Sequence, residues 1–410
     1  MSEPRRLAPA LLAAATICAA AAPMIAAPDP SEVRALWVLR TSLESPEAIG
    51  RMVTMAAGHG FNTLLVQVRG RGDAFYNGGV ETRAASLAAQ GDTFDPLAET
   101  LARAKAAGLR VHAWVNVNLV SSATELPASR EHVIYEHPEW LMVPRELAPE
   151  LLTTDPRSPE YLGRLARWTR ANDAAVEGLY VSPVHPDAAA YIASVVGDLA
   201  ARYAVDGVHL DYVRYPGADF DYSRGALAAF EAEMRARVSP AERDRVEAIQ
   251  AIDPFAWPWE FGEEWRRFRQ SRLTALVARL RSTVVKARPS AIVSAAVVPD
   301  PREAVREKLQ DWRTWVDNGF IDVLCPMAYT QEAAVFAEQV AEVRALAAGR
   351  PVWAGIGAYR LTPRETIDNI ATARRLGAGG IILFSYDSLI SPPNGTEYLA
   401  AVGRAAFSGS

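Results

Sequence analysis

The chain has 410 residues, of which 50% are hydrophobic and 22% are charged, so its composition is globular and excludes an intrinsically disordered protein. Its length allows two or three ordinary domains, or one large α/β barrel with insertions. The 43 basic and 48 acidic residues give a net charge of −5, which excludes the basic surface typical of nucleic-acid-binding proteins.

The first 27 residues have the features of a secretory signal peptide. Arg5 and Arg6 precede an apolar run over residues 11–22, and small residues follow up to Ala27, where we expect cleavage. The run is too short and too alanine-rich for a good membrane span. We therefore expect a periplasmic or secreted protein with no stable membrane insertion after cleavage. Only Cys325 of the two cysteines then remains, which excludes an internal disulfide.

Short apolar runs alternate with helical segments along the rest of the chain. They predict eight strands, at residues 35–39, 63–68, 110–116, 207–211, 292–297, 321–325, 351–356 and 380–385. Helix starts are indicated by an N-cap residue followed by proline, as in Ser45-Pro46 and Asp95-Pro96. Eight strands with helices between them favour a closed (β/α)₈ barrel, the TIM-barrel fold.

Two connections are longer than ordinary loops: residues 117–187 after the third strand and residues 212–262 after the fourth. In a TIM barrel both lie at the catalytic face, where the strands end. We therefore expect a signal peptide over residues 1–27, one barrel over residues 32–390, and a helix and tail over residues 391–410.

Carboxylates, amides and aromatic rings follow the predicted strands at that face. The candidate site residues are Gln67, Arg69, Asp73, Tyr76 and Glu81 after the second strand; Trp114 and Asn116 in the third; His209, Asp211, Arg214 and Tyr215 around the end of the fourth; and Asp300, Tyr329, Tyr359, Tyr386 and Asp387 after the later strands. Aromatic faces stack on pyranose rings, amides and arginines hold hydroxyl groups, and paired carboxylates carry out glycoside hydrolysis. The six histidines show no metal-ligand spacing, so we expect no metal and no cofactor.

Four motifs resemble those of the glycosyl hydrolase-like 10 family. They are Gln67-Val68-Arg69 with Gly72-Asp73-Ala74-Phe75-Tyr76, His112-Ala113-Trp114-Val115-Asn116, Gly207-Val208-His209-Leu210-Asp211-Tyr212 with Tyr215-Pro216, and Cys325-Pro326-Met327-Ala328-Tyr329. The resemblance covers roughly residues 32–390 and implies an exported bacterial (β/α)₈ glycosidase with a glycan substrate. A characterised branch of that family cuts peptidoglycan glycan strands stripped of peptides. The fourth-strand run also resembles the α-amylase clan, whose nucleophilic aspartate occupies the position of Asp211.

The chain departs from the family pattern at two places. Family members often carry a second aspartate where this chain has Tyr212, and a proline-rich dipeptide is replaced by Gly70-Arg71. Both departures concern substrate choice.

Within this resemblance, Asp211 is expected to be the ionised carboxylate that attacks or stabilises the anomeric centre, and Glu81 the proton donor. Asp300 is the alternative acid, although its spacing to Glu303 also fits a helix capping box. Asp73 is expected to be a paired carboxylate that holds the geometry of the site.

One of Arg69 and Arg214 is expected to hold a carboxylate, either of the protein or of a lactyl-bearing sugar such as N-acetylmuramic acid, because the planar guanidinium matches a carboxylate bidentately. His209 is expected to support the site rather than to bind a metal. The aromatic residues between Phe255 and Trp265 either pack a long loop or form a glycan-stacking wall.

The sequence therefore predicts an exported glycoside hydrolase that cleaves a polysaccharide, first of all peptidoglycan glycan strands, by a two-carboxylate mechanism. Two alternatives stay open: a catalytically inactive glycan-binding barrel, and a hydrolase of another, α-glucan-like polysaccharide. A metal-dependent polysaccharide deacetylase would need clusters of His and Asp ligands, which the sequence lacks.

Overall fold

The computed structural model describes residues 31–392 and 395–407, so the predicted signal peptide lies outside the described residues. Eight parallel strands form a closed barrel in chain order, and the eighth pairs with the first. The strands are β1 (Val33–Val38), β2 (Thr63–Arg69), β3 (Arg110–Asn116), β4 (Gly207–Asp211), β5 (Ile292–Val297), β6 (Val323–Ala328), β7 (Trp353–Ile356) and β8 (Gly380–Leu383). The (β/α)₈ prediction is confirmed.

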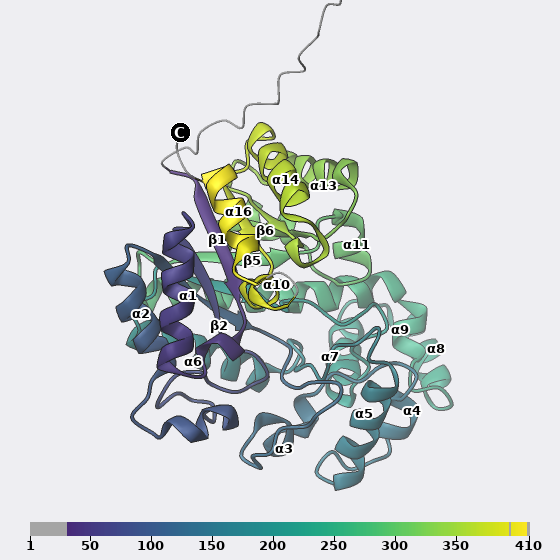
Figure 1. Cartoon of the computed structure of the whole chain (residues 1–410). Helices are drawn as coiled ribbons and strands as arrows, with labels where there is room; N and C mark the ends of the chain where they lie inside the picture. Colours follow the sequence, from purple (N-terminus) through teal and green to yellow (C-terminus); the bar gives the residue numbers. More distant parts are fainter. Residues whose placement is uncertain (1–30, 393–394, 408–410) are drawn as a thin grey trace, which may run out of the picture.

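Helices surround this barrel (Figure 1). Those that alternate with the strands are α1 (Pro46–Gly58), α2 (Pro96–Ala106), α6 (Pro186–Arg202), α10 (Gly262–Ala287), α11 (Pro301–Arg306), α12 (Trp312–Asp317), α13 (Ala333–Leu346) and α14 (Pro363–Arg375). Their N-termini follow from local sequence. Ser45 and Asp95 each accept a hydrogen bond from the backbone of the first turn, and Thr362 with Glu365 forms a capping box.

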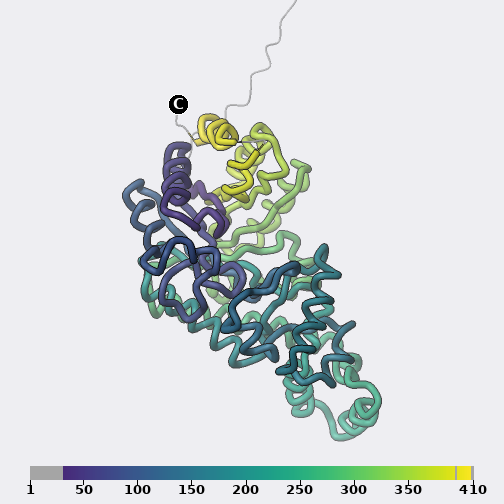
Figure 2. Tube along the Cα trace, turned by 60° about the horizontal axis from the view of Figure 1, so that its bottom comes forward, coloured from purple at the N-terminus to yellow at the C-terminus, as the bar shows by residue number. Residues whose placement is uncertain are grey.

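The two long connections carry helices of their own. The first holds α3 (Val133–Glu136), α4 (Ala148–Leu151) and α5 (Pro159–Ala171), and the second holds α7 (Arg224–Arg235), α8 (Pro240–Gln250) and α9 (Ala256–Glu260). These helices gather on one side of the barrel (Figure 1), and in Figure 2 the second insertion projects furthest from the C-terminal helix. Both insertions follow carboxyl ends of strands, so they build on the face where barrel enzymes carry their sites.

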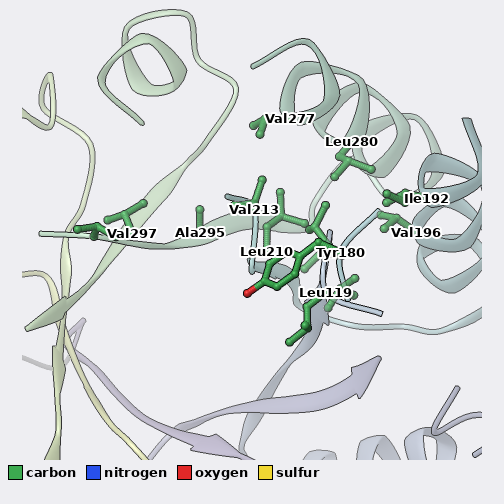
Figure 3. Packing of buried hydrophobic residues seen from close by; sticks show 14 of the residues in the cluster. Leu119, Tyr180, Ile192, Val196, Leu210, Val213, Val277, Leu280, Ala295 and Val297 are labelled. Atoms are coloured by element: carbon green, nitrogen blue, oxygen red, sulfur yellow. The ribbon is translucent and has the colours of Figure 1, made fainter. Parts of the chain in front are cut away.

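The outer core lies between the strands and the surrounding helices. In Figure 3, Ile192 and Val196 of α6 and Leu280 of α10 lie close to Leu210 of β4, and all four are fully buried. Leu119, at the start of the first insertion, continues the same cluster. The insertion is thus anchored on the apolar core of the barrel, which fixes where its polar residues lie.

Inside the barrel, large aromatic side chains fit against glycines. A Cβ on Gly207 would lie 2.4 Å from Nδ1 of His112, and a Cβ on Gly355 would lie 2.8 Å from Cη2 of Trp37. Real Cβ atoms do not approach neighbours this closely, because interiors are already close-packed. These strand glycines therefore make the space in which Trp37 and His112 fill the barrel.

The chain ends with α15 (Tyr386–Ile390), α16 (Glu397–Val402) and a π-helical turn over Gly403–Phe407. Phe407 packs edge-on against Phe61, which precedes β2, with ring centroids 5.0 Å apart. The turn over Gly403–Phe407 therefore packs at the end of the barrel opposite the insertions. Among the described residues, no helix combines the length and the hydropathy needed to cross a bilayer.

Candidate functional site

Asp211 ends β4 and is held by two donors. Its Oδ1 accepts a hydrogen bond from the backbone N–H of Tyr212 at 2.6 Å and another from Arg214 at 3.1 Å. The side chains of Asp211 and Arg214 are each 9% exposed, so the pair is largely shielded from water. No donor within the described part of the chain contacts Oδ2, which leaves that oxygen available to a substrate.

The backbone after Asp211 turns sharply. Tyr212 has a φ of 48°, in the left-handed region that bulky residues rarely adopt. The turn lets its N–H return to the preceding carboxylate, and the guanidinium of Arg214 stacks over its ring at 4.1 Å. Strained backbone of this kind clusters at functional sites, because the surrounding structure must hold it.

Arg214 also reaches a second carboxylate, Glu177 of the first insertion. Its guanidinium lies 3.9 Å from Oε1 of Glu177, and the hydroxyl of Tyr180 donates to Oε2 at 2.7 Å. Burial alone would raise the pKa of Glu177, but the charge of Arg214 and the Tyr180 hydrogen bond lower it. The Glu177 side chain is 43% exposed. Two carboxylates from different elements therefore share one arginine.

Glu81, the predicted proton donor, lies in a different environment. Arg69 donates to both of its carboxylate oxygens at 2.7 Å, and both side chains are completely buried. Tyr191 of α6 adds a third hydrogen bond at 3.2 Å. Arg69 also donates to the backbone carbonyls of Asn116 and Val117 at the end of β3. In this conformation both carboxylate oxygens of Glu81 are hydrogen-bonded and shielded from solvent, so Glu81 is not available to a glycosidic oxygen in the mouth.

Asp300, the alternative acid, and Asp387, another candidate site residue, hold local structure. Asp300 caps α11 by accepting from the backbone N–H groups of Arg302 and Glu303, at 2.7 and 3.1 Å. Asp387 accepts from the N–H of Leu39 at 2.7 Å and from the hydroxyl of Ser42 at 2.7 Å, so it fixes the turn that follows β1. Both aspartates therefore have a structural role, which for Asp300 is the capping alternative that the sequence left open.

His209 lies inside the barrel, below the mouth. Its Nε2 accepts from the indole N–H of Trp37 at 3.0 Å, so Nδ1 carries the proton and donates to the hydroxyl of Ser294 at 2.9 Å. Burial, and then the neighbouring His112, lower the pKa of His209 to about 3. A neutral histidine in this position supports the barrel interior beneath Asp211.

The predicted amide residues also form an internal network. Trp114 donates to Oδ1 of Asn116 at 2.9 Å, and Nδ2 of Asn116 donates to the carbonyl of Gly70 at 2.8 Å, with both side chains buried. Gln67 accepts from the guanidinium of Arg40 at 3.0 Å. These amides therefore position the loop after β2 and the side chain of Arg40.

An aromatic wall stands beside Asp211. Tyr329 stacks on Phe384 with ring centroids 5.3 Å apart, and Tyr359 meets Tyr329 edge-on at 6.3 Å. Burial, and then the charge of Asp211, raise the pKa of the Tyr329 hydroxyl, which places that ring close to the carboxylate. Tyr359 is 42% exposed, so its ring offers a surface on which a sugar can stack.

Three predicted tyrosines pack away from this mouth. The structure buries Tyr76 edge-on against Tyr203, Tyr215 with its hydroxyl on the backbone carbonyl of Arg269, and Tyr386 with its hydroxyl on the sulfur of Met55. Chain position predicts that these tyrosines belong to the site, but their side chains pack against the surrounding elements instead.

Asp73, predicted to be a paired carboxylate, accepts from the backbone N–H of Arg71 at 3.0 Å. Together with Arg40 and Arg71 it lines a cavity of about 400 Å³ between the loop after β2 and the first insertion. Its contact is therefore with the loop backbone, and the Arg69 side chain is occupied by Glu81.

A larger cavity, of about 730 Å³, lies between the two insertions. Of the aromatic residues between Phe255 and Trp265, Trp257 and Trp265 are buried and serve packing, whereas Trp259 is 53% exposed and lines this cavity. Arg145 stacks over the Trp259 ring at 3.9 Å. Loop packing thus accounts for most of the cluster.

The described residues contain no cluster of three or more His, Cys, Asp or Glu side chains suited to a metal ion.

Cys325 lies in the barrel interior, where burial raises the pKa of its thiol well above the ordinary value. The thiol is therefore unreactive, because the thiolate is the nucleophilic form.

Arg40 and Glu177 are among the mouth residues that sequence reasoning missed. Arg40 lies two residues after β1 and could have been found by applying the strand-end rule to the first strand. Glu177 lies deep within the first insertion, 37 residues before its ion-pair partner Arg214, and nothing local in the sequence marks it.

The glycosyl hydrolase-like 10 family matches residues 32–357 of the chain. The glycosyl hydrolase YngK of Bacillus subtilis (strain 168) is 23% identical over 332 residues, which cover 73% of this chain and 54% of YngK. The glycosyl hydrolase DigH of Escherichia coli (strain K12) is 24% identical over 289 residues, 66% of this chain and 55% of DigH. The chain thus spans about half the length of these curated relatives.

Solved glycosidase structures share the fold. The glycoside hydrolase domain of PgaB (BpsB) from Bordetella bronchiseptica superposes with a TM-score of 0.62 at 17% identity, covering 92% of this chain and all of that domain. A β-galactosidase from Bacillus circulans sp. alkalophilus gives 0.58 at 14% identity, over 91% of this chain and 56% of that one. With the family match over most of its length, the chain belongs to the glycosyl hydrolase-like 10 family.

Proposed function

We propose that this protein is an exported glycosidase that hydrolyses glycan strands of the bacterial cell wall, with Asp211 as its central carboxylate. The observation that carries the proposal is the end of β4, where Asp211 is fixed by Arg214 and Tyr212 with one oxygen left unengaged, beside the aromatic wall of Tyr329 and Tyr359. Family membership and the barrel fold support glycoside hydrolysis.

The geometry suits Asp211 to an anomeric centre that gains positive charge. Arg214 lies 3.1 Å from Asp211, and a carboxylate in the position of Asp211 either attacks the anomeric centre or stabilises it. The strand end and the backbone N–H of Tyr212 fix the carboxylate before substrate arrives, so little reorganisation is needed during the reaction. Tyr359 supplies an exposed ring for stacking.

The second carboxylate in this proposal is Glu177 instead of Glu81. Glu177 reaches the guanidinium that holds Asp211, and its side chain is 43% exposed, whereas both oxygens of Glu81 are engaged by Arg69. In the free protein Glu177 is ionised. A bound sugar that displaces water from it would favour the protonated form, because burial disfavours the charge. Glu177 would then donate the proton to the leaving group.

The relatives and the N-terminal sequence support the proposed glycan and compartment. YngK and DigH are glycosyl hydrolases of bacteria, and residues 1–27 have the pattern of a secretory signal. An exported glycosidase meets the cell wall, so peptide-free peptidoglycan strands are the first substrate to test.

The test measures new reducing ends released from peptide-free peptidoglycan strands, and from α- and β-glucans as comparison substrates. We expect turnover of the peptidoglycan strands by the wild type and its loss in Asp211→Asn. Glu177→Gln should lose more activity on substrates with poor leaving groups than on activated aryl glycosides, because the latter need little protonation.

The competing function is a glycan-binding barrel without activity. Saturable binding of these strands without any release of reducing ends would establish that alternative and overturn the hydrolase. Turnover of α-glucans alone would support the hydrolase and show that the proposed substrate is wrong.

A further inference from the structure

Two arginines at the mouth have no carboxylate in ion-pair contact within the described residues: Arg40, which follows β1, and Arg71, in the loop after β2. Both line the cavity of about 400 Å³ beside the first insertion. This distinguishes them from Arg69 and Arg214, the arginines that sequence reasoning assigned to a carboxylate, because the protein's own Glu81 and Asp211 occupy those two.

The two guanidinium groups lie close enough to repel. Burial, and then the charge of Arg71, lower the pKa of Arg40, so the pair is held together at an electrostatic cost. Arg40 donates to Gln67 at 3.0 Å, which orients it, but Gln67 supplies no charge. Nε of Arg71 is buried and has no hydrogen-bond partner. A buried donor left unpaired in this way is costly unless a ligand supplies the acceptor.

The remaining charged groups of the cavity do not neutralise the pair. Arg83 is fully engaged, because it donates to backbone carbonyls including those of Leu87 and Phe94. Burial lowers the pKa of His132, which is therefore neutral at pH 7. Glu125 is exposed to solvent.

Asp73 is the one carboxylate left to offset both arginines in the cavity. Its Oδ1 is engaged by the backbone of Arg71, and its charge acts on Arg40 without forming an ion pair with it. Glu44, outside the cavity, also acts on Arg40 from a distance. The cavity therefore has an excess of positive charge that one further carboxylate would balance.

The position of the cavity connects it to the site. Arg40 and Arg71 both interact electrostatically with the hydroxyl of Tyr212, the residue whose N–H holds Asp211. A glycan that extends from Asp211 past Tyr212 toward this cavity would bring a neighbouring sugar to the two arginines. A cavity of this volume is within the range of small-ligand sites.

We propose that Arg40 and Arg71 form a subsite that binds a carboxylate carried by the glycan. The inference rests on the proposed function, since it assumes a glycan in the mouth, and adds which sugars the site prefers. Guanidinium groups match carboxylates in planar, bidentate hydrogen bonds, and the orphaned Nε of Arg71 would gain its acceptor. A lactyl ether on an amino sugar and the C6 carboxylate of a uronic acid share this chemistry.

The test measures equilibrium binding by calorimetry with Asp211→Asn, so that turnover plays no part. The probes are peptide-free peptidoglycan oligosaccharides, the same oligosaccharides with their carboxylates reduced to alcohols, and oligouronates. We expect the carboxylate-bearing peptidoglycan oligosaccharides to bind at least about tenfold more tightly than the reduced ones. Preference for oligouronates over both would identify uronic acid as the source of the carboxylate.

Adding Arg71→Gln or Arg40→Gln should abolish this preference, by weakening the binding of the carboxylate-bearing probe much more than that of the reduced probe. Arg364→Gln is the matched control, because that arginine is exposed on α14 and its removal changes the net charge equally. Equal affinity for native and reduced probes, or a preference that survives both substitutions, would overturn the subsite. A carboxylate preference in a protein that hydrolyses none of the glycans would overturn the proposed hydrolase and keep the subsite.

Discussion

Arg69 and Glu81 form a bidentate ion pair, 2.7 Å at both contacts, with both side chains completely buried between β2 and its following loop. The pair also joins β2 to β3, since Arg69 donates to the carbonyl of Val117 at 3.1 Å. It ties two neighbouring strand ends together at the mouth of the barrel.

Glu81→Gln should therefore destabilise the fold, by about 3–5 kcal/mol, because it leaves the buried charge of Arg69 without its counter-charge. Urea unfolding measures the change. The double variant Arg69→Met with Glu81→Leu should lose less stability than either single change. A Glu81→Gln protein with wild-type stability that fails only on substrates with poor leaving groups would make Glu81 the proton donor after all.

Asp211→Asn should cost less stability than Glu81→Gln, because Arg214 keeps Glu177 at 3.9 Å, and should lose turnover by on the order of 10³- to 10⁴-fold, as expected when a central catalytic group is removed. The amide keeps the shape and still accepts from Tyr212, but carries no charge toward the substrate. Reducing-end release and thermal unfolding are measured together. Wild-type turnover in this variant would refute the mechanism.

Asp300→Asn should leave activity and stability close to wild type, because asparagine caps helices about as well as aspartate. Asp300→Ala should cost about 1 kcal/mol, since two N–H groups at the start of α11 lose their acceptor. Both are read by urea unfolding with turnover measured alongside. An inactive Asp300→Asn with native stability would move the acid role to this residue.

Acid should destabilise the protein through the barrel histidines. Burial lowers the pKa of both His209 and His112 to about 3, against an ordinary value of roughly 6.5. Between those two values the unfolded chain binds more protons than the folded one. The free energy of unfolding should therefore fall as the pH falls from about 6.5 toward 3, by about 1.4 kcal/mol per pH unit for each histidine.

Urea unfolding at a series of pH values checks this slope, and His112→Leu should reduce it. That side chain has a buried Nδ1 with no hydrogen-bond partner, so leucine removes the titration without orphaning a neighbour. An unchanged slope in the variant would show that other groups control acid unfolding.

The barrel and the position of Asp211 at its mouth were predictable because their signals are local. Strands β3, β4 and β5 begin and end where their apolar runs do, and Asp211 follows from the rule that barrel strands end at the catalytic face. The environment of Glu81 was not predictable, because it depends on how the loop after β2 folds back. That path pairs Ala74 with both Arg69 and Arg83 and returns Glu81 to Arg69.

The same reason explains the orientation of the tyrosines and the place of Glu177. Tyr76 and Tyr386 follow strands in the sequence, but the first side chain packs against Tyr203 and the second against Met55 of α1. The sequence shows where a strand ends, but it does not show in which direction the side chains after that end point. Glu177 reaches Arg214 through tertiary packing of the insertion alone.

Arg214 contacts both Asp211 at the end of β4 and Glu177 in the first insertion, so a change that moves Glu177 also changes the contact that holds Asp211. Loops on a barrel ordinarily vary freely, because the strands carry the fold. Here a deletion in the insertion that removes Glu177 would leave Arg214 paired with Asp211 alone, and would strengthen that contact. The path of the first insertion therefore affects the charge balance around Asp211, a carboxylate that the insertion itself does not carry.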